Sequence, residues 1–265
     1  MLRDRSIQRL DRNTPGEVTV TIDEPYPTRE EIRLLATKPL PRGLLAADNC
    51  GKGSMEYKLY DPVVTWKTFP VRYAFETSVN QDMRNGIIKS FDIYNELKPG
   101  FFEHGILTDA KLKVSMDNLG GTNGTLARAS WSYSTSTFAV TKATITFDSS
   151  DKWAWLTNES CGSTGSTYDI GNVAVHEIGH TCGLAHAPTD PLQTMYASTS
   201  PGKTLGRTFG NGDEAGLRKL YNIIVTPTPP QPTELEEITS QMRTLVADFN
   251  KAINLQFDEL EELST

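Results

Sequence analysis

The sequence lacks the features by which membrane-spanning and nucleic-acid-binding proteins are most easily recognised. A helix that crosses a bilayer needs about 20 consecutive apolar residues, and the 265 residues contain no such run. Positive charge is also in short supply, because 26 Lys and Arg stand against 33 Asp and Glu, which gives a formal net charge of -7. An acidic chain is poorly suited to a nucleic-acid backbone or an anionic membrane. We therefore expect no transmembrane segment and no nucleic-acid partner.

An intact secretory signal is missing as well. The first six residues, Met1 to Ser6, include charged side chains, and no apolar core follows them, whereas a signal peptide carries an apolar stretch of about 7–15 residues. Two alternatives remain open. Either the protein stays inside the cell, or a signal was removed before this numbering begins.

Cysteine is scarce, with three residues in the chain. Cys161 lies in a Gly/Ser/Thr-rich loop, and Cys182 follows at the end of a predicted helix. We predict a disulfide between them, which would fix the loop to the helix and implies an oxidising compartment; the alternative is two unpaired thiols. The bridge favours a secreted or extracellular location, and it leaves Cys50 as an odd cysteine.

Histidine is scarce too, yet three of the four histidines fall within one stretch of eleven residues. Residues 176–186 read H-E-x-x-H-x-x-G-x-x-H, a pattern typical of zinc peptidases. A lone histidine on a helix is most often packed or exposed without a ligand, and a bare H-E-x-x-H recurs by chance. The longer form with its glycine is far more restrictive, so the stretch indicates a metal site.

The spacing within this stretch predicts how the site is built. On a helix over residues 172–182, His176 and His180 lie one turn apart on the same face and can bind one ion. Glu177 lies about 100° round the helix, beside the metal without being forced to bind it. Gly183 lets the chain turn, so that His186 can return as third ligand. Three imidazoles leave a fourth position for water, which indicates one catalytic zinc.

The remaining pattern predicts a mixed α/β (α+β) fold. Apolar residues first recur at helical spacing over one long stretch. Several short stretches of alternating apolar and polar residues follow, and then the helix that carries the zinc motif. We expect strands at 69–75, 112–116, 125–129 and 144–148, and helices at 80–97, 172–182 and 212–221.

Composition divides the chain into four segments. Residues 1–53 read as an N-terminal extension with a short strand at 17–22 and a short helix at 28–36. The Pro-rich stretch after the catalytic unit predicts a stiff linker, and the apolar residues behind it recur at helical spacing. The predicted segments are 1–53 (extension), 54–225 (catalytic domain), 226–232 (linker) and 233–265 (amphipathic helix). Residues 233–263 could self-associate or pack along their own catalytic domain.

Five stretches between about residues 66 and 222 together resemble the matrixin branch of the metzincins. The zinc motif is the first of them. The others are Met195-Tyr196, Gly120–Ala129, Ile145–Asp148 with Trp153, and Asp213–Tyr221.

This resemblance implies a metzincin-like catalytic domain with a twisted mixed sheet, a backing helix and an active-site helix. It implies that Met195 lies in a tight turn beneath the metal. It also implies an edge strand along which a peptide substrate pairs by its backbone. The strand residues are Leu126, Ala127, Arg128 and Ala129.

The sequence departs from the matrixin pattern in its second metal site. Matrixins usually bind a structural zinc through additional histidines, but His104 is the one histidine outside the motif, and Thr146 stands where a ligand is expected. We predict no structural zinc. Asp148 and Asp151 could bind Ca²⁺ through their carboxylates, although such residues are also ordinary turn formers.

The end of the N-terminal extension resembles the segment that keeps matrixin zymogens latent. In those zymogens a cysteine thiolate takes the place of water on zinc, and Asn49-Cys50-Gly51 lies before the first catalytic strand. Cys50 could therefore act as a latency switch. The alternatives are that Asp48 blocks the metal with its carboxylate, or that the extension has no inhibitory role.

These patterns predict a zinc-dependent endopeptidase. If the N-terminal extension inhibits the catalytic domain, the chain is a zymogen. Glu177 would act as general base and a peptide or protein would be the substrate. The rival hypothesis is a catalytically inert, metal-stabilised binding or assembly protein that recruits a partner through its C-terminal helix.

Overall fold

The computed structural model describes residues 7–14, 16–25, 52–121, 125–157, 165–187, 189–224, 239 and 241–246. The chain forms two compact units, residues 1–223 and residues 224–265. Within the second unit, residues 241–246 are helical and exposed. The rest of the predicted amphipathic helix lies outside the described residues, as do the predicted linker and the predicted helix at 28–36. No helix in the described ranges combines the length and apolar character of a membrane span.

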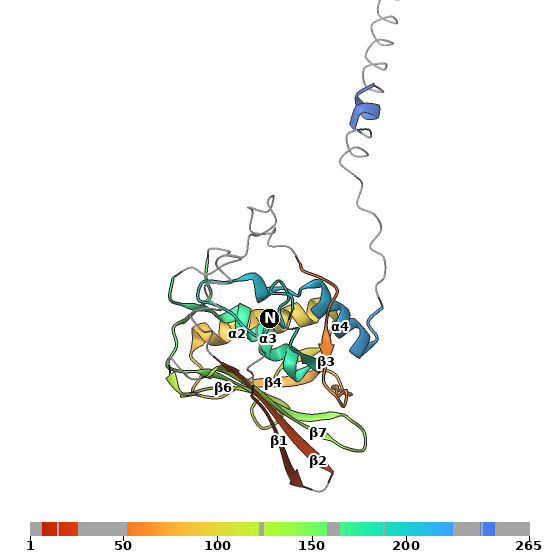
Figure 1. Ribbon diagram of the computed structural model, residues 1–265. Coiled ribbons are helices and arrows are strands. Elements are labelled where there is room, and N and C mark those ends of the chain that lie inside the picture. Colours follow the sequence, from red (N-terminus) through yellow and green to blue (C-terminus); the bar gives the residue numbers. More distant parts are fainter. Residues whose placement is uncertain are drawn as a thin grey trace, which may run out of the picture. The chain divides into compact units, whose positions relative to one another are not determined.

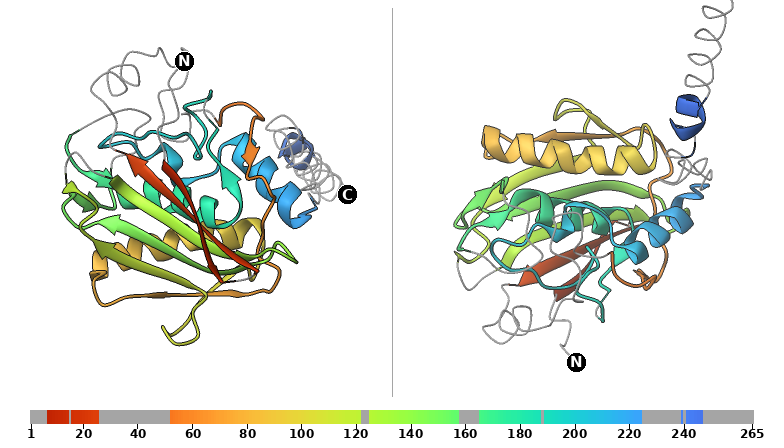
Figure 2. Two further views of the ribbon diagram at one scale, coloured as in Figure 1. Left: turned by 60° about the horizontal axis from the view of Figure 1, so that its bottom comes forward. Right: turned by 90° about the horizontal axis from the view of Figure 1, so that it is seen from above.

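A seven-stranded mixed sheet forms the framework of the first unit (Figures 1 and 2). The strand order is β1-β2-β7-β8-β6-β4-β5. The middle of the sheet is parallel, since β6 pairs in parallel with both β8 and β4, whereas β7 is antiparallel to both of its neighbours. The strands are β1 (Ile7–Thr14), β2 (Glu17–Pro25), β4 (Val71–Phe75), β5 (Phe102–His104), β6 (Leu112–Asp117), β7 (Thr125–Ser134) and β8 (Val140–Asp148).

Two long helices lie on the same face of this sheet (Figure 1). Helix α2 (Gln81–Leu97) begins where the side chain of Asn80 accepts a hydrogen bond from the Met83 amide (3.0 Å), as N-cap residues do. Helix α3 (Ile170–Thr181) carries the first half of the zinc motif and packs against α2. Helix α4 (Asn211–Tyr221) and a short 3₁₀ turn, η3 (Leu205–Arg207), follow. The mixed α/β prediction is therefore confirmed.

Two pairs of very short strands tie loops to this framework. Strand β3 (Lys58–Leu59) pairs with β11 (Leu184–Ala185), which lies just after α3. Strand β9 (Trp153–Ala154) pairs with β10 (Tyr168–Asp169), which leads directly into α3. Both ends of the metal helix are thus connected to distant parts of the chain.

The N-terminal residues extend the main sheet. Strands β1 and β2 form a hairpin, and β2 pairs with β7 from Glu17 opposite Ser134 to Pro25 opposite Thr125. Val20 and Ile22 on β2 are only 5% and 3% exposed and join the hydrophobic core. Residues 7–25, which the sequence placed in the extension, are therefore continuous with the catalytic sheet. The alternating pattern of residues 17–22 predicted a strand there, but it did not predict that this strand pairs with β7.

Candidate metal centre

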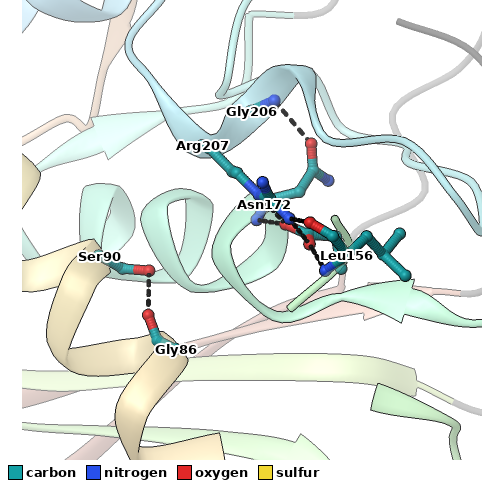
Figure 3. A network of polar contacts seen from close by, with 7 residues as sticks. Gly86, Ser90, Leu156, Asn172, Gly206 and Arg207 are labelled. Atoms are coloured by element: carbon teal, nitrogen blue, oxygen red, sulfur yellow. Dashed lines mark hydrogen bonds and ion pairs between the residues drawn. The ribbon is translucent and has the colours of Figure 1, made fainter. Parts of the chain in front are cut away.

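A buried ion pair fixes the start of the metal helix. Asp169 caps α3 by accepting the amide hydrogen of Asn172 (2.8 Å), and it also binds the Arg207 guanidinium (2.5 Å). Arg207 donates in addition to the carbonyl of Leu156 (2.6 Å), and the amide of Gly206 donates to the Asn172 side chain (2.7 Å; Figure 3). The network joins η3 to the first turn of α3. It therefore fixes the N-terminal end of the helix, which precedes the two histidines of the zinc motif on α3.

Three histidine side chains converge after this start. The Nε2 atom of His180 lies 3.0 Å from Nε2 of His176 and 3.1 Å from Nε2 of His186. The three residues are 0–7% exposed. Three ligands held about 2.05 Å from zinc in a tetrahedron are about 3.3 Å apart. The observed separations are within a few tenths of an ångström of this value.

Backbone carbonyls set the protonation of two of these rings. His176 Nδ1 lies 2.7 Å from the carbonyl oxygen of Thr194, and His180 Nδ1 lies 2.9 Å from that of Leu184. Because a carbonyl oxygen only accepts, each Nδ1 carries the hydrogen, and in the neutral ring Nε2 is a bare lone pair. Lone pairs pointed at one another repel unless a cation lies between them, so the donor set fits a bound zinc.

A glycine turns the chain between the second and third histidines. Gly183 has φ of +98°, in the left-handed region, and a Cβ atom there would lie 2.5 Å from the carbonyl oxygen of Val64. Strand β11 follows Gly183 and pairs with β3, and His186 follows β11 directly. Only glycine satisfies both the backbone angle and the contact.

We expect Gly183→Ala to lower the stability of the fold and the affinity for zinc. The left-handed angle alone costs about 1–3 kcal/mol for a residue with a side chain, and the contact with Val64 adds to that. Gly100→Ala is the matched control, because Gly100 has φ of +72° with no atom within 4 Å of its would-be Cβ. Thermal unfolding and zinc titration measure the effect. An equal loss in both variants would show that the contact with Val64 does not matter.

A tight turn carrying Met195 packs beneath the histidines. Met195 is 2% exposed, and a Cβ atom on Gly179 of α3 would lie 2.5 Å from its sulfur. The buried carboxylate of Asp213 holds the turn by accepting the amide hydrogens of Thr194 (2.5 Å) and Met195 (3.2 Å). Burial raises the pKa of Asp213, and these hydrogen bonds oppose the rise. The same turn positions the carbonyl oxygen of Thr194, which contacts Nδ1 of His176 and orients its ring.

Glu177 and His176 line one pocket. Glu177 is fully buried and lines the pocket together with His176, and Leu126 of β7 lies in the same wall. A buried carboxylate beside three converging imidazoles can hold a proton close to a bound substrate.

Residues 64–222 match the family model described as matrixin. The chain belongs to the matrixin family. The chain is 28% identical over 181 residues to Metalloendoproteinase 1 of Glycine max, an alignment that covers 63% of this chain and 56% of the relative. It is 27% identical over 180 residues to Metalloendoproteinase 1-MMP of Arabidopsis thaliana, covering 62% and 46%. Against neutrophil collagenase of Homo sapiens the identity is 30% over 84 residues, covering 32% and 16%. This matrixin spans about half the length of the first two relatives.

The predicted substrate strand of this matrixin is not a free edge. Leu126, Ala127, Arg128 and Ala129 lie on β7 as predicted, but β7 pairs with β8 on one side and with β2 on the other. Asp23 of β2 forms an ion pair with Arg128. The prediction that this strand is a free edge is therefore wrong while β2 is paired with β7.

The predicted disulfide is not confirmed. Cys182 is a free thiol that is fully buried behind α3. The Tyr221 hydroxyl donates to its carbonyl oxygen (2.9 Å), and burial raises the pKa of the thiol well above its ordinary value. Cys161 lies outside the described residues, as do Cys50 and Asp48. A thiol packed into the core in this way is poorly reactive.

The residues considered for further metals lie apart from the histidine cluster. His104 is exposed on β5 and contacts the ring of Tyr73, while Thr146 on β8 hydrogen-bonds Ser115 (3.0 Å). Asp148 accepts the amide hydrogens of Ser150 (2.7 Å) and Gly121 (3.1 Å), which is the role of a turn former. Burial raises the pKa of Asp151 to about 6. Calcium binding by Asp148 and Asp151 stays a prediction.

Several residues of the matrixin site were not found from the sequence. The Tyr60 hydroxyl lies 2.8 Å from His180 Nδ1, Asp213 holds the Met195 turn, and Lys203 lines the pocket. Asp213 was noted only for its place at the start of α4. No local pattern marks these residues, because each reaches the site through a contact between distant parts of the chain.

Proposed function

We propose that this matrixin is a zinc-dependent endopeptidase. The observation that supports this most strongly is the convergence of three histidines, with Nε2 of His180 3.0 Å and 3.1 Å from the other two Nε2 atoms, next to the buried Glu177 in the sequence. His176, His180 and His186 would hold the metal. A zinc ion held in this way would lower the pKa of a water molecule and polarise a carbonyl group. Cleavage of a fluorogenic peptide, lost on adding a zinc chelator and restored by zinc, tests the proposal.

Glu177 is the proton carrier in this proposal. Its carboxylate takes the proton of the attacking water and later delivers it to the amine of the leaving peptide. The carboxylate is fully buried, and the carbonyls of Thr194 and Leu184 keep two imidazoles in the tautomer that binds metal. The inert assembly protein is the rival, and it would bind zinc without turnover.

We also propose that the form with β2 on β7 is latent. An extended peptide binds most readily by adding a strand to a free sheet edge, and β2 occupies the edge of β7 beside the pocket that Leu126 and Glu177 share. Side chains reinforce this pairing, since Thr19 and Thr21 hydrogen-bond Ser132 (2.6 Å) and Ser130 (3.1 Å). The chain would become fully active when β2 leaves.

If Cys50 supplies a thiolate to the metal, Cys50→Ala should raise the peptidase activity of the full-length chain, because the fourth position would open to water. The measurement is the initial rate on a fluorogenic peptide without prior treatment. Asp48→Ala is the companion variant, and a rise there alone would assign the blocking role to Asp48. Full activity in the unaltered chain, unchanged in both variants, would end the hypothesis of a switch at these residues.

We place the protein outside the cell, in keeping with a protease that is kept latent. The C-terminal residues 233–263 remain a candidate for self-association. Light scattering of the full chain against a chain ending at residue 232 tests this, since equal oligomeric states would exclude the role.

A further inference from the structure

One lysine is buried in the wall of the pocket that holds Glu177. Lys203 is 5% exposed and lines this pocket together with His176 and Glu177. A buried charge is costly unless an opposite charge lies close to it. Among the residues that the structure describes, Lys203 has no ion-pair partner, and its ammonium donates one hydrogen bond, to the carbonyl oxygen of Pro191 (3.2 Å). An ammonium has three hydrogens to donate, so two remain.

Asp190, whose charge acts on Lys203, already accepts other hydrogen bonds. The carboxylate of Asp190 accepts the amide hydrogens of Ser54 (2.6 Å) and Leu192 (3.0 Å). Burial lowers the pKa of Lys203 to about 8, and the charge of Asp190 opposes the shift. A group with that pKa is mostly protonated at pH 7, so the pocket wall carries a positive charge.

A second donor lies in the same wall. The Ser198 hydroxyl oxygen is buried and has no hydrogen-bond partner in the described part of the chain. By contrast, Asn172, another lining residue, is held at both ends of its carboxamide, since Gly206 donates to its oxygen (2.7 Å) and its nitrogen donates to Thr199 (2.7 Å). Lys203 and Ser198 thus give the pocket wall two groups with hydrogens still to donate.

We infer that this pocket receives the carboxylate side chain of an Asp or Glu residue next to the scissile bond. The inference rests on the proposed peptidase function and adds the substrate class. A carboxylate accepts hydrogen bonds from both Lys203 and Ser198, and it supplies the charge that the buried ammonium lacks. An apolar side chain would leave both groups without a hydrogen-bond acceptor. This cost separates acidic from apolar substrates more strongly than the gain from the new hydrogen bonds does. Lys203 acts as a specificity-determining residue.

The test uses fluorogenic peptides that differ at one position beside the cleaved bond, which carries Glu, Gln or Leu. The cut site is confirmed by mass spectrometry, and Glu is placed before the bond in one set and after it in the other. In the unaltered chain, kcat/KM for the Glu peptide in one set should exceed that for its Gln counterpart by about 10–100-fold, the usual value of a charge-assisted contact. Comparing peptides within one variant cancels any effect of latency on the absolute rate.

Lys203→Met should remove this preference, whereas Lys152→Met, at an exposed lysine outside the pocket, should keep it. If Lys203→Met does not fold, Lys203→Arg should retain the preference and Ser198→Ala should reduce it. Cleavage of all three peptides with the same ratios in the unaltered chain and the Lys203 variant would overturn the inference.

A failure of the peptidase proposal is distinguishable. If no peptide is cleaved by any variant loaded with zinc, calorimetry with the uncleaved Glu and Gln peptides decides the inference alone. Tighter binding of the Glu peptide that depends on Lys203 would support an acidic-peptide pocket without turnover, and equal binding would remove it.

Discussion

Glu177→Ala should retain zinc and lose nearly all peptidase activity. A positioned general base contributes about 10²–10⁴-fold to the rate, and Glu177 lies beside the histidines without being needed to bind the ion. The measurement is kcat/KM on a fluorogenic peptide, together with the zinc content of the purified protein by elemental analysis. A loss of rate at full zinc occupancy assigns the proton transfer to this carboxylate.

The control for this variant is Glu96→Ala, which removes an exposed carboxylate from α2. It should leave both the rate and the zinc content unchanged. Turnover by Glu177→Ala close to that of Glu96→Ala would remove Glu177 from the role of base. Loss of zinc along with the rate would show instead that Glu177 supports the metal.

Detaching β2 from β7 should raise peptidase activity by at least about 10-fold, since a peptide can then pair with the freed strand. Val20→Asp/Ile22→Asp places two carboxylates where β2 contributes buried apolar side chains to the core. An unpaired buried charge costs more than the hairpin contacts are worth, so the hairpin should leave the sheet. Faster hydrogen exchange at β7 amides would report that release directly, and kcat/KM would report its effect.

Val63→Asp is the matched control for the hairpin variant, because it makes the same substitution at a valine that is 50% exposed. It should change neither exchange at β7 nor the rate. Asp23→Ala is a milder variant that removes the ion pair with Arg128 and should raise the rate by a smaller factor. Faster exchange at β7 with no gain in rate would contradict the proposed latency, since the free edge would then not limit turnover.

The sequence predicted the parts of the site that depend on local geometry. The spacing of His176 and His180 on a helix, and the turn at Gly183, require only neighbouring residues, and the structure brings His186 to them as expected. The helix predicted at 80–97 likewise matches α2, which spans Gln81–Leu97. These features follow from backbone periodicity and the conformational freedom of glycine.

The features that the sequence did not predict are contacts over long sequence separations. Alternation marked Thr125–Ala129 as a strand, but it cannot say whether a strand is an edge or is paired on both sides, and β2 comes from more than 100 residues earlier. The burial of Cys182 was missed for a similar reason, because its place at the end of a predicted helix does not reveal that it lies in the core. Burial of Lys203 also depends on how a loop packs, which composition does not encode.

If the proposed latent form is activated by proteolysis, the pairing of β3 with β11 limits where the chain can be cut. Residues just before β3 are bound to the catalytic unit, since the amide of Asn211 donates to the Lys52 carbonyl (2.6 Å) and its side chain to that of Gly53 (2.9 Å). Tyr60, directly after β3, contacts His180. A cut beyond this segment would remove a strand from beside His186 and a hydroxyl from the metal centre. A processing enzyme that releases the hairpin and spares the site therefore has to act between Pro25 and Lys52.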